Sequence, residues 1–197
     1  IILYPQWQII TYSVKAVFVP NVLNAEPISF NEMYPNTHGR YVDIVDNNTL
    51  INYAIGYPVL ISAPETLSGM TYLGYSFSST ATREEITAGN FYKEAMTEES
   101  ILVYLYYEFN IDVGVQGVGS ATCDKQKAIV GETINLTATP GLGYEFAYWL
   151  EDGTKVSTEQ NFSTVVSDYH SYTAVFIGKR VTVELNEYIE GQSKGRF

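Results

Sequence analysis

The feature that constrains the fold most is a segment that occurs twice. Residues 54–76 align with residues 128–150, and a later aromatic position and the ends of two closing strands continue the match. Self-similarity of this kind indicates a chain assembled from small repeated units. The matched positions are Gly56 with Gly131, Val59 with Ile134, Ile61 with Leu136, Ala63 with Ala138, Gly69 with Gly143, Tyr72 with Phe146, Tyr75 with Trp149, Phe91 with Phe162 and Phe109 with Phe176.

Within each copy the hydrophobic residues alternate with polar ones. Ile134, Leu136 and Ala138 are separated by polar residues, which is the period of a β-strand with one face on the core. Pro140 ends this strand, and Asp152-Gly153 indicates a hairpin further on. Short helical turns are expected only at residues 90–100 and 161–168. The predicted class is mainly β (α+β), each unit being a twisted sheet with at most a short helix.

The repeats predict where the units begin and end. Residues 19–109 form a first unit with an N-terminal insertion, and residues 110–178 form a second one. Residues 1–18 are the end of a preceding unit or N-terminal strands. Residues 179–197 are the start of a further copy or a C-terminal strand, because residues 180–191 repeat the alternation of residues 110–119. This pattern favours a piece of a longer tandem array.

A cluster of aromatic residues follows the Pro-Gly-Leu-Gly break of the second unit. Burying one large ring removes about 150–250 Å² from water, which matters greatly to a small core. We therefore expect Phe146 and Trp149 in the core, whereas Tyr144 and Tyr148 are open to a ligand role. In a regular strand Trp149 would lie opposite the other three rings or beyond a bulge. The predicted structural core is Phe146, Trp149, Tyr72, Tyr75, Phe162 and Phe176.

The strand at residues 101–109 carries a row of tyrosines. One face, with Val103, Leu105 and Tyr107, is expected to be buried, and the other carries Tyr104 and Tyr106. Exposed tyrosine rows suit protein or carbohydrate contacts. The alternative is packing against a neighbouring unit or against residues 19–53. The candidate ligand-binding residues are Tyr104, Tyr106, Tyr144 and Tyr148.

The composition disfavours several other functions. Acidic residues number 22 against 11 basic ones, so nucleic acid is not an expected partner. No apolar run is long enough for a membrane span. One cysteine excludes an intrachain disulfide, and His38 and His170 are too few for a zinc site. Residues 43–48 could hold a cation weakly or form a solvated turn. We expect no cofactor, no metal and no catalysis.

Residues 131–176 carry a recognisable motif. It runs from Gly-Glu-Thr at residues 131–133 through the alternating strand ending at Pro140, Gly-Tyr-x-Phe-x-x-Trp and an acidic turn to a closing Thr-Ala-Val-Phe. This motif resembles the divergent form of the internalin B-repeat. Residues 110–178 match well, and residues 54–109 match loosely, with Tyr75 in the place of tryptophan.

The resemblance implies tandem, β-grasp-like modules in an extracellular or wall-attached bacterial protein. It also implies a non-catalytic role as stalk, spacer or adhesion module, with a host or cell-wall protein or glycan as partner. The alternative function is a carbohydrate- or protein-binding module attached to a secreted enzyme.

Overall fold

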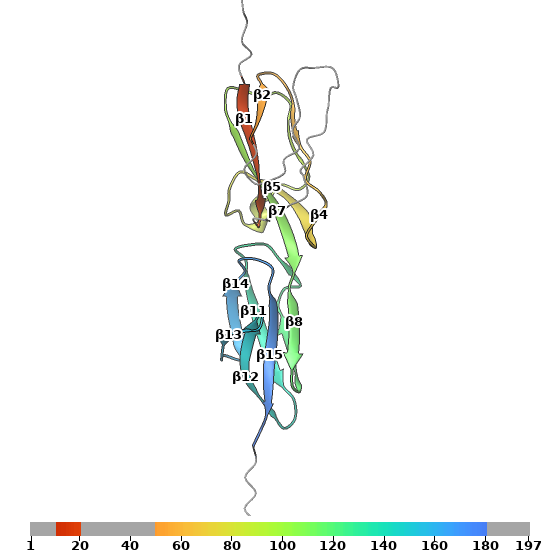
Figure 1. The fold of residues 1–197 in the computed structure, drawn as a ribbon, viewed down its shortest axis with the longest axis vertical. Helices are drawn as coiled ribbons and strands as arrows, with labels where there is room; N and C mark the ends of the chain where they lie inside the picture. Colours follow the sequence, from red (N-terminus) through yellow and green to blue (C-terminus); the bar gives the residue numbers. More distant parts are fainter. Residues whose placement is uncertain (1–10, 21–49, 181–197) are drawn as a thin grey trace, which may run out of the picture.

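The computed structural model describes residues 11–20 and 50–180, which form two β units stacked along one long axis (Figure 1). The first unit contains the strands β1 to β7, and the second contains β8 to β15. Most of the expected insertion, His38, residues 43–48 and the expected further copy from residue 181 onward lie outside the described residues.

The first unit is built on a sheet with the strand order β2-β1-β7-β5-β4. Strand β1 runs parallel to β7, and the other neighbours on this path are antiparallel. The strand at residues 11–19 thus belongs to the first unit. A second, two-stranded sheet pairs β3 with β6. The elements are β1 (Thr11–Val19), β2 (Leu50–Ala54), β3 (Val59–Ile61), β4 (Thr66–Leu67), β5 (Met70–Ser76), the 3₁₀ turn η1 (Arg83–Glu85), β6 (Phe91–Lys93) and β7 (Ile101–Asn110).

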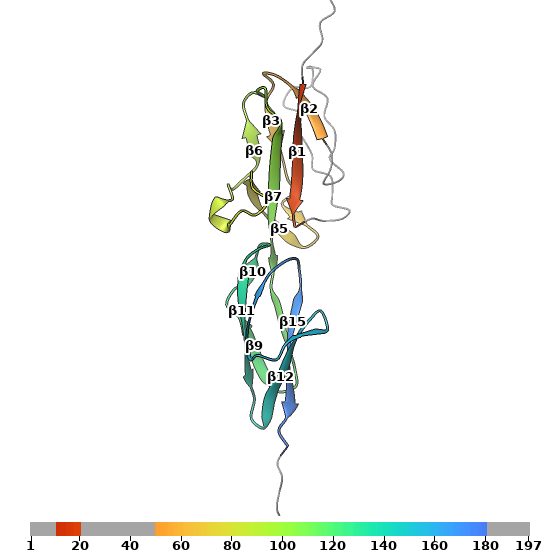
Figure 2. The same ribbon diagram turned by 90° about the vertical axis from the view of Figure 1, so that its left-hand side faces the viewer.

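The second unit has two sheets, with the orders β13-β12-β15-β8 and β14-β11-β9. Here β15 runs parallel to β8, and the remaining pairs are antiparallel. Figure 2 shows β9 and β11 beside β12 and β15. The strands are β8 (Asp112–Gln116), β9 (Gly119–Cys123), β10 (Lys127–Ala128), β11 (Thr133–Pro140), β12 (Tyr144–Glu151), β13 (Thr154–Ser157), β14 (Asn161–Val165) and β15 (Ser171–Gly178).

The mainly β class is confirmed, but both expected helical turns are wrong. Residues 90–100 contain β6 and residues 161–168 contain β14, whereas the helical piece of the described chain is η1. Phe91 pairs with Ile61 and Phe162 pairs with Leu136, so each phenylalanine brings its strand onto the core. Tertiary packing outweighs local helical preference here.

The two units share details of strand register. Ile61 opposes Phe91 as Leu136 opposes Phe162. A β-bulge follows Tyr72 in β5, and another follows Phe146 in β12. Because Tyr72 opposes Tyr107 and Phe146 opposes Phe176, the counterpart of Phe176 is Tyr107 and not Phe109 as the sequence alignment had it.

The bulge in β12 explains how the aromatic cluster packs. It inserts one extra residue between Phe146 and Tyr148, which shifts the alternation of the strand by one position. Trp149 is therefore fully buried on the side of Phe146, with the ring centroids 5.9 Å apart. Its indole N–H donates to the carbonyl oxygen of Gln160 at 3.3 Å. Phe176 is also buried, whereas Tyr72, Tyr75, Phe146 and Phe162 are half-buried against the same core.

Candidate functional site at the junction of the two units

The junction is the contact of β7 and the loop of residues 78–86 with residues 124–133 of the second unit. Only Ile111 separates the end of β7 from the start of β8, so the chain passes from one unit to the other as an almost unbroken strand. The short strand β10 pairs antiparallel with the end of β7. In addition, the amide of Ile111 donates to the carbonyl oxygen of Gln126 at 2.9 Å. The backbones of the two units are thus hydrogen-bonded where they meet.

A small apolar cluster fills the inside of the junction. Ile129 of the second unit is 1% exposed and packs with Ala81 and Tyr106 of the first unit. The hydroxyl of Tyr106 donates to the carbonyl oxygen of Ser78 at 2.8 Å and accepts from the amide of Ala81 at 2.9 Å. The 78–86 loop is thereby fixed over β7, and Ile129 is held beneath it.

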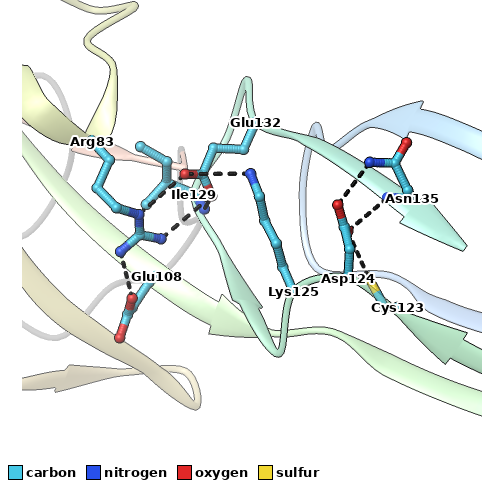
Figure 3. Close-up of polar contacts among 8 residues, drawn as sticks. All are labelled: Arg83, Glu108, Cys123, Asp124, Lys125, Ile129, Glu132 and Asn135. Carbon is cyan, nitrogen blue, oxygen red and sulfur yellow. Dashed lines mark hydrogen bonds and ion pairs between the residues drawn. The ribbon is translucent and has the colours of Figure 1, made fainter.

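An ionic cluster lies beside Ile129 (Figure 3). The Arg83 guanidinium donates from Nη1 to Glu108 at 2.9 Å and from Nε and Nη2 to the two oxygens of Glu132, at 3.1 and 3.4 Å. Lys127 lies 2.8 Å from Glu108, and Lys125 lies 3.7 Å from Glu132. Glu132 also accepts from the amide of Ile129 at 3.1 Å. A single arginine of the first unit thus bridges a carboxylate of each unit.

The surroundings keep both carboxylates charged. Burial alone would favour the protonated acids, but hydrogen bonds from Lys127 and Arg83 lower the pKa of Glu108 below its usual range. Burial would also raise the pKa of Glu132, but hydrogen bonds from the Arg83 guanidinium and the Ile129 amide lower it below its usual range. The hydrogen bond to Glu132 in turn raises the pKa of Arg83. Glu108, Glu132 and Arg83 are therefore ionised at neutral pH.

The sequence left open whether the face of Tyr104 and Tyr106 is exposed or is packed against a neighbouring unit or residues 19–53, and in the structure this face is covered. Tyr106 is 1% exposed, and Tyr104 is half-buried against the same apolar cluster. The reason is the 78–86 loop, which returns over this face of β7 with Ala81 and Ile86 pointing into the cluster. Leu102, which lies on the same face of β7, stays exposed. The face is therefore packed against protein, chiefly the loop of its own unit, with Ile129 of the neighbouring unit beside Tyr106.

The other two candidate tyrosines lie in the second unit and do not join Tyr104 and Tyr106. Tyr148 is half-buried, and the Lys155 ammonium lies 4.9 Å from the centre of its ring. Tyr144 is half-buried as well and lines an open depression of about 820 Å³ together with Leu142. The four candidate residues do not form one site.

His170 is part of a surface hydrogen-bond network. Its Nδ1 lies 2.6 Å from Asp152 and its Nε2 lies 3.4 Å from the hydroxyl of Ser167. Asp152 also accepts from the amide and the hydroxyl of Ser171, and the His170 hydrogen bond is the largest cause that lowers the pKa of Asp152. These bonds tie the β12–β13 turn to the start of β15.

The described residues contain neither a metal-binding cluster nor a membrane-spanning helix. In residues 11–20 and 50–180, no group of three histidine, cysteine or acidic side chains is arranged to hold a metal ion. No helix in the same part of the chain is long and apolar enough to cross a membrane.

Sequence reasoning missed the junction. Glu132 was noted as part of the Gly-Glu-Thr motif, but Arg83 lies 49 residues earlier in the chain and no local pattern links the two. The tyrosines on the second face of the strand at residues 101–109 were a signal that something covers this face. Nothing in the sequence identified the 78–86 loop as the covering segment.

One of the comparisons with known proteins gave a match, and it falls on the second unit. No curated protein and no solved structure gives a significant match to the chain. Residues 109–180 match the family model described as the divergent InlB B-repeat domain. This segment begins at the end of β7 and ends just after β15, so it coincides with the second unit. The resemblance seen in the sequence is confirmed for these residues, which match a divergent InlB B-repeat and indicate a module of a bacterial surface protein.

Proposed function

We propose that the chain is a tandem pair of B-repeat-like modules that acts as a stiff, non-catalytic spacer in an extracellular bacterial protein. The observation that carries the proposal is the junction, where strand pairing, a buried Ile129 and the Arg83 bridge act together. The match of residues 109–180 supports the extracellular bacterial setting.

The tandem arrangement is supported by the registers that the two units share. Both have a parallel strand beside the closing strand, a bulge at the same place, and the same isoleucine–phenylalanine or leucine–phenylalanine pairing in a separate sheet. The family resemblance also supports a β-grasp-like description of each unit. The first unit differs in two ways: β2 pairs with β1 in the main sheet, whereas β9 pairs with β11 in the other sheet of its unit, and the loop between β5 and β6 is longer and makes the junction.

Stiffness follows from the kind of contact. Units joined by a linker move relative to each other unless their interface is substantial and apolar. Here the buried core is continuous across the boundary, because Phe109 of β7 and Ala128 of β10 belong to one cluster. At about 3.3 Å per residue, β7 and β8 together extend for roughly 50 Å along the long axis. Such an arrangement holds the N-terminal end of the first unit at a fixed distance from the C-terminal end of the second unit.

The proposal can be tested by displaying the chain on a bacterial surface with a fluorophore at its N-terminus. Energy transfer to a dye in the cell envelope then reports the height of the fluorophore. Deleting residues 112–178, which span β8 to β15, should lower the height. Inserting an unrelated rigid module of the same length should restore both the height and any adhesion that the cells show.

Two results would contradict a spacer. The height could stay the same after the deletion, which would mean that the second unit does not extend the protein. Alternatively, the unrelated module could restore the height without restoring adhesion, which would mean that the surface of the second unit binds a partner directly.

A further inference from the structure

An open cleft lies on the side of the first unit, away from the junction. It has a volume of about 570 Å³ and is lined by the end of β5, by β6 and by the start of β7. Three apolar side chains at this cleft are unusually exposed: Phe77 at 64%, Tyr92 at 50% and Leu102 at 42%. Clefts of this size are typical of small-ligand sites.

The most exposed ring is held in place by rings beneath it. The centroid of Phe77 lies 5.8 Å from that of Phe91, with the two planes at 90°, and 6.0 Å from that of Tyr75. Phe91 is itself buried and packs edge-on against Tyr75 at 5.3 Å. A ring oriented in this way presents its free surface to a ligand without losing much conformational entropy on binding.

The cleft is open because the two units differ after the bulged strand. In the second unit, β12 pairs with β15 as far as Glu151 opposite Tyr172, so β12 covers the start of β15. In the first unit, β5 ends at Ser76 and the chain leaves for the junction through the 78–86 loop. Among the described residues no strand therefore continues β5 beside the start of β7. The loop that builds the junction thus also uncovers the aromatic residues behind it.

The polar groups at the cleft indicate what kind of ligand fits. Lys93 and Glu99 supply one positive and one negative charge, so the cleft itself carries no net charge. In a chain with a net charge of −11, such a cleft does not favour phosphate or acidic ligands. Charged side chains beside exposed rings are suited to a neutral ligand with hydroxyls on its edges and C–H groups on its faces.

A peptide that adds a strand fits less well. Strand β6 is three residues long and already pairs with β3, and β7 lacks a β5 partner only over residues 101–103, so both edges at the cleft are short for main-chain hydrogen bonds. We propose that the cleft of Phe77, Tyr92 and Leu102 binds a neutral saccharide, with the rings of Phe77 and Tyr92 as stacking surfaces. This goes beyond the spacer function and does not depend on it.

The test is an NMR titration of the full chain with neutral glucose, galactose, mannose and N-acetylglucosamine oligosaccharides at millimolar concentration. At least one of them should shift the amide signals of residues 91–93 and 99–102 in a saturable way. Phe77→Ala and Tyr92→Ala should each weaken that binding about tenfold or more, which corresponds to about 1.4 kcal/mol. Phe77→Tyr keeps the ring and should retain binding.

Tyr169→Ala is the matched control, because Tyr169 is also 50% exposed but lies in the second unit. It should leave saccharide binding unchanged. The proposal is overturned if none of these oligosaccharides shifts the cleft signals, if an acidic saccharide binds better, or if the Tyr169 variant loses binding equally. It is also overturned if an extended peptide binds the cleft and the neutral saccharides do not. The height measurements on displayed chains are independent of all these outcomes.

Discussion

Ile129→Ala should loosen the junction without unfolding either unit. The substitution removes three carbon atoms from a side chain that is almost completely buried against Ala81 and Tyr106. At about 0.8 kcal/mol per methylene plus the cavity left behind, the loss is about 2–4 kcal/mol. If this contact holds the units together, a loss of about 3 kcal/mol raises the ratio of open to closed junctions roughly a hundredfold.

The change can be measured with spin labels in the two units. Cysteines at the exposed positions Glu94 and Thr158, in a Cys123→Ser background, report the distance distribution by pulsed electron resonance. We expect a narrow distribution for the parent and a broad one for Ile129→Ala.

The matched control is Ile134→Ala. Ile134 is equally buried, but in the core of the second unit, so its replacement should lower the melting temperature and leave the distribution narrow. The reasoning is refuted if Ile129→Ala keeps a narrow distribution, or if both variants broaden it to the same extent.

Two further predictions concern the ionic cluster and one glycine. The pKa values of Glu108 and Glu132 are lowered in the folded protein. Their contribution to the stability of the junction is therefore complete above the pKa of the unfolded chain, about 4.3, and is lost as the pH falls through the pKa values of the folded protein. The spin-label distribution should therefore broaden below about pH 4 and stay unchanged between pH 6 and 8; a constant width down to pH 3 would contradict this. Gly74→Ala should destabilise the first unit by about 2–4 kcal/mol in denaturant unfolding, because the new Cβ would lie 2.2 Å from the carbonyl oxygen of Thr87. The control Gly69→Ala, also at positive φ but with nothing within 4 Å, should lose only about 1 kcal/mol, and equal losses would count against the steric explanation.

Local pattern was enough to predict several of the strands and the hairpin at Asp152-Gly153. The alternation of Ile134, Leu136 and Ala138 predicts a strand with one buried face, and these three side chains are buried. The alignment of Phe91 with Phe162 also agrees with the observed registers, since each opposes an aliphatic residue of the preceding aligned strand. These features depend on neighbours along the strand, which a sequence records directly.

Features that depend on distant segments could not be predicted. Nothing near Tyr106 shows that a loop some 25 residues earlier folds back over it and binds its hydroxyl. The position of Trp149 depends on a bulge, and the sequence allowed a bulge there without requiring one. The helical turns expected around Phe91 and Phe162 failed because burial of those rings decided the backbone instead.

The junction could not be predicted for the same reason, because it is formed by segments that lie far apart in the sequence. The tyrosine-rich strand was recognised as needing a partner on its second face, but sequence could not distinguish a ligand from another part of the chain. The partner is the 78–86 loop together with Ile129, and the same loop carries Arg83 to Glu132. Its path also leaves Phe77 exposed, which a reading of the strand pattern alone did not suggest.

The most direct test of the central claim is whether the two units tumble as one body. Residual dipolar couplings of backbone N–H groups, measured in a weakly aligned sample, give an alignment tensor for each unit separately. A rigid junction predicts that residues 11–20 and 50–108 and residues 112–180 share one tensor in magnitude and orientation. Two tensors that differ clearly in magnitude would show independent motion and contradict the account.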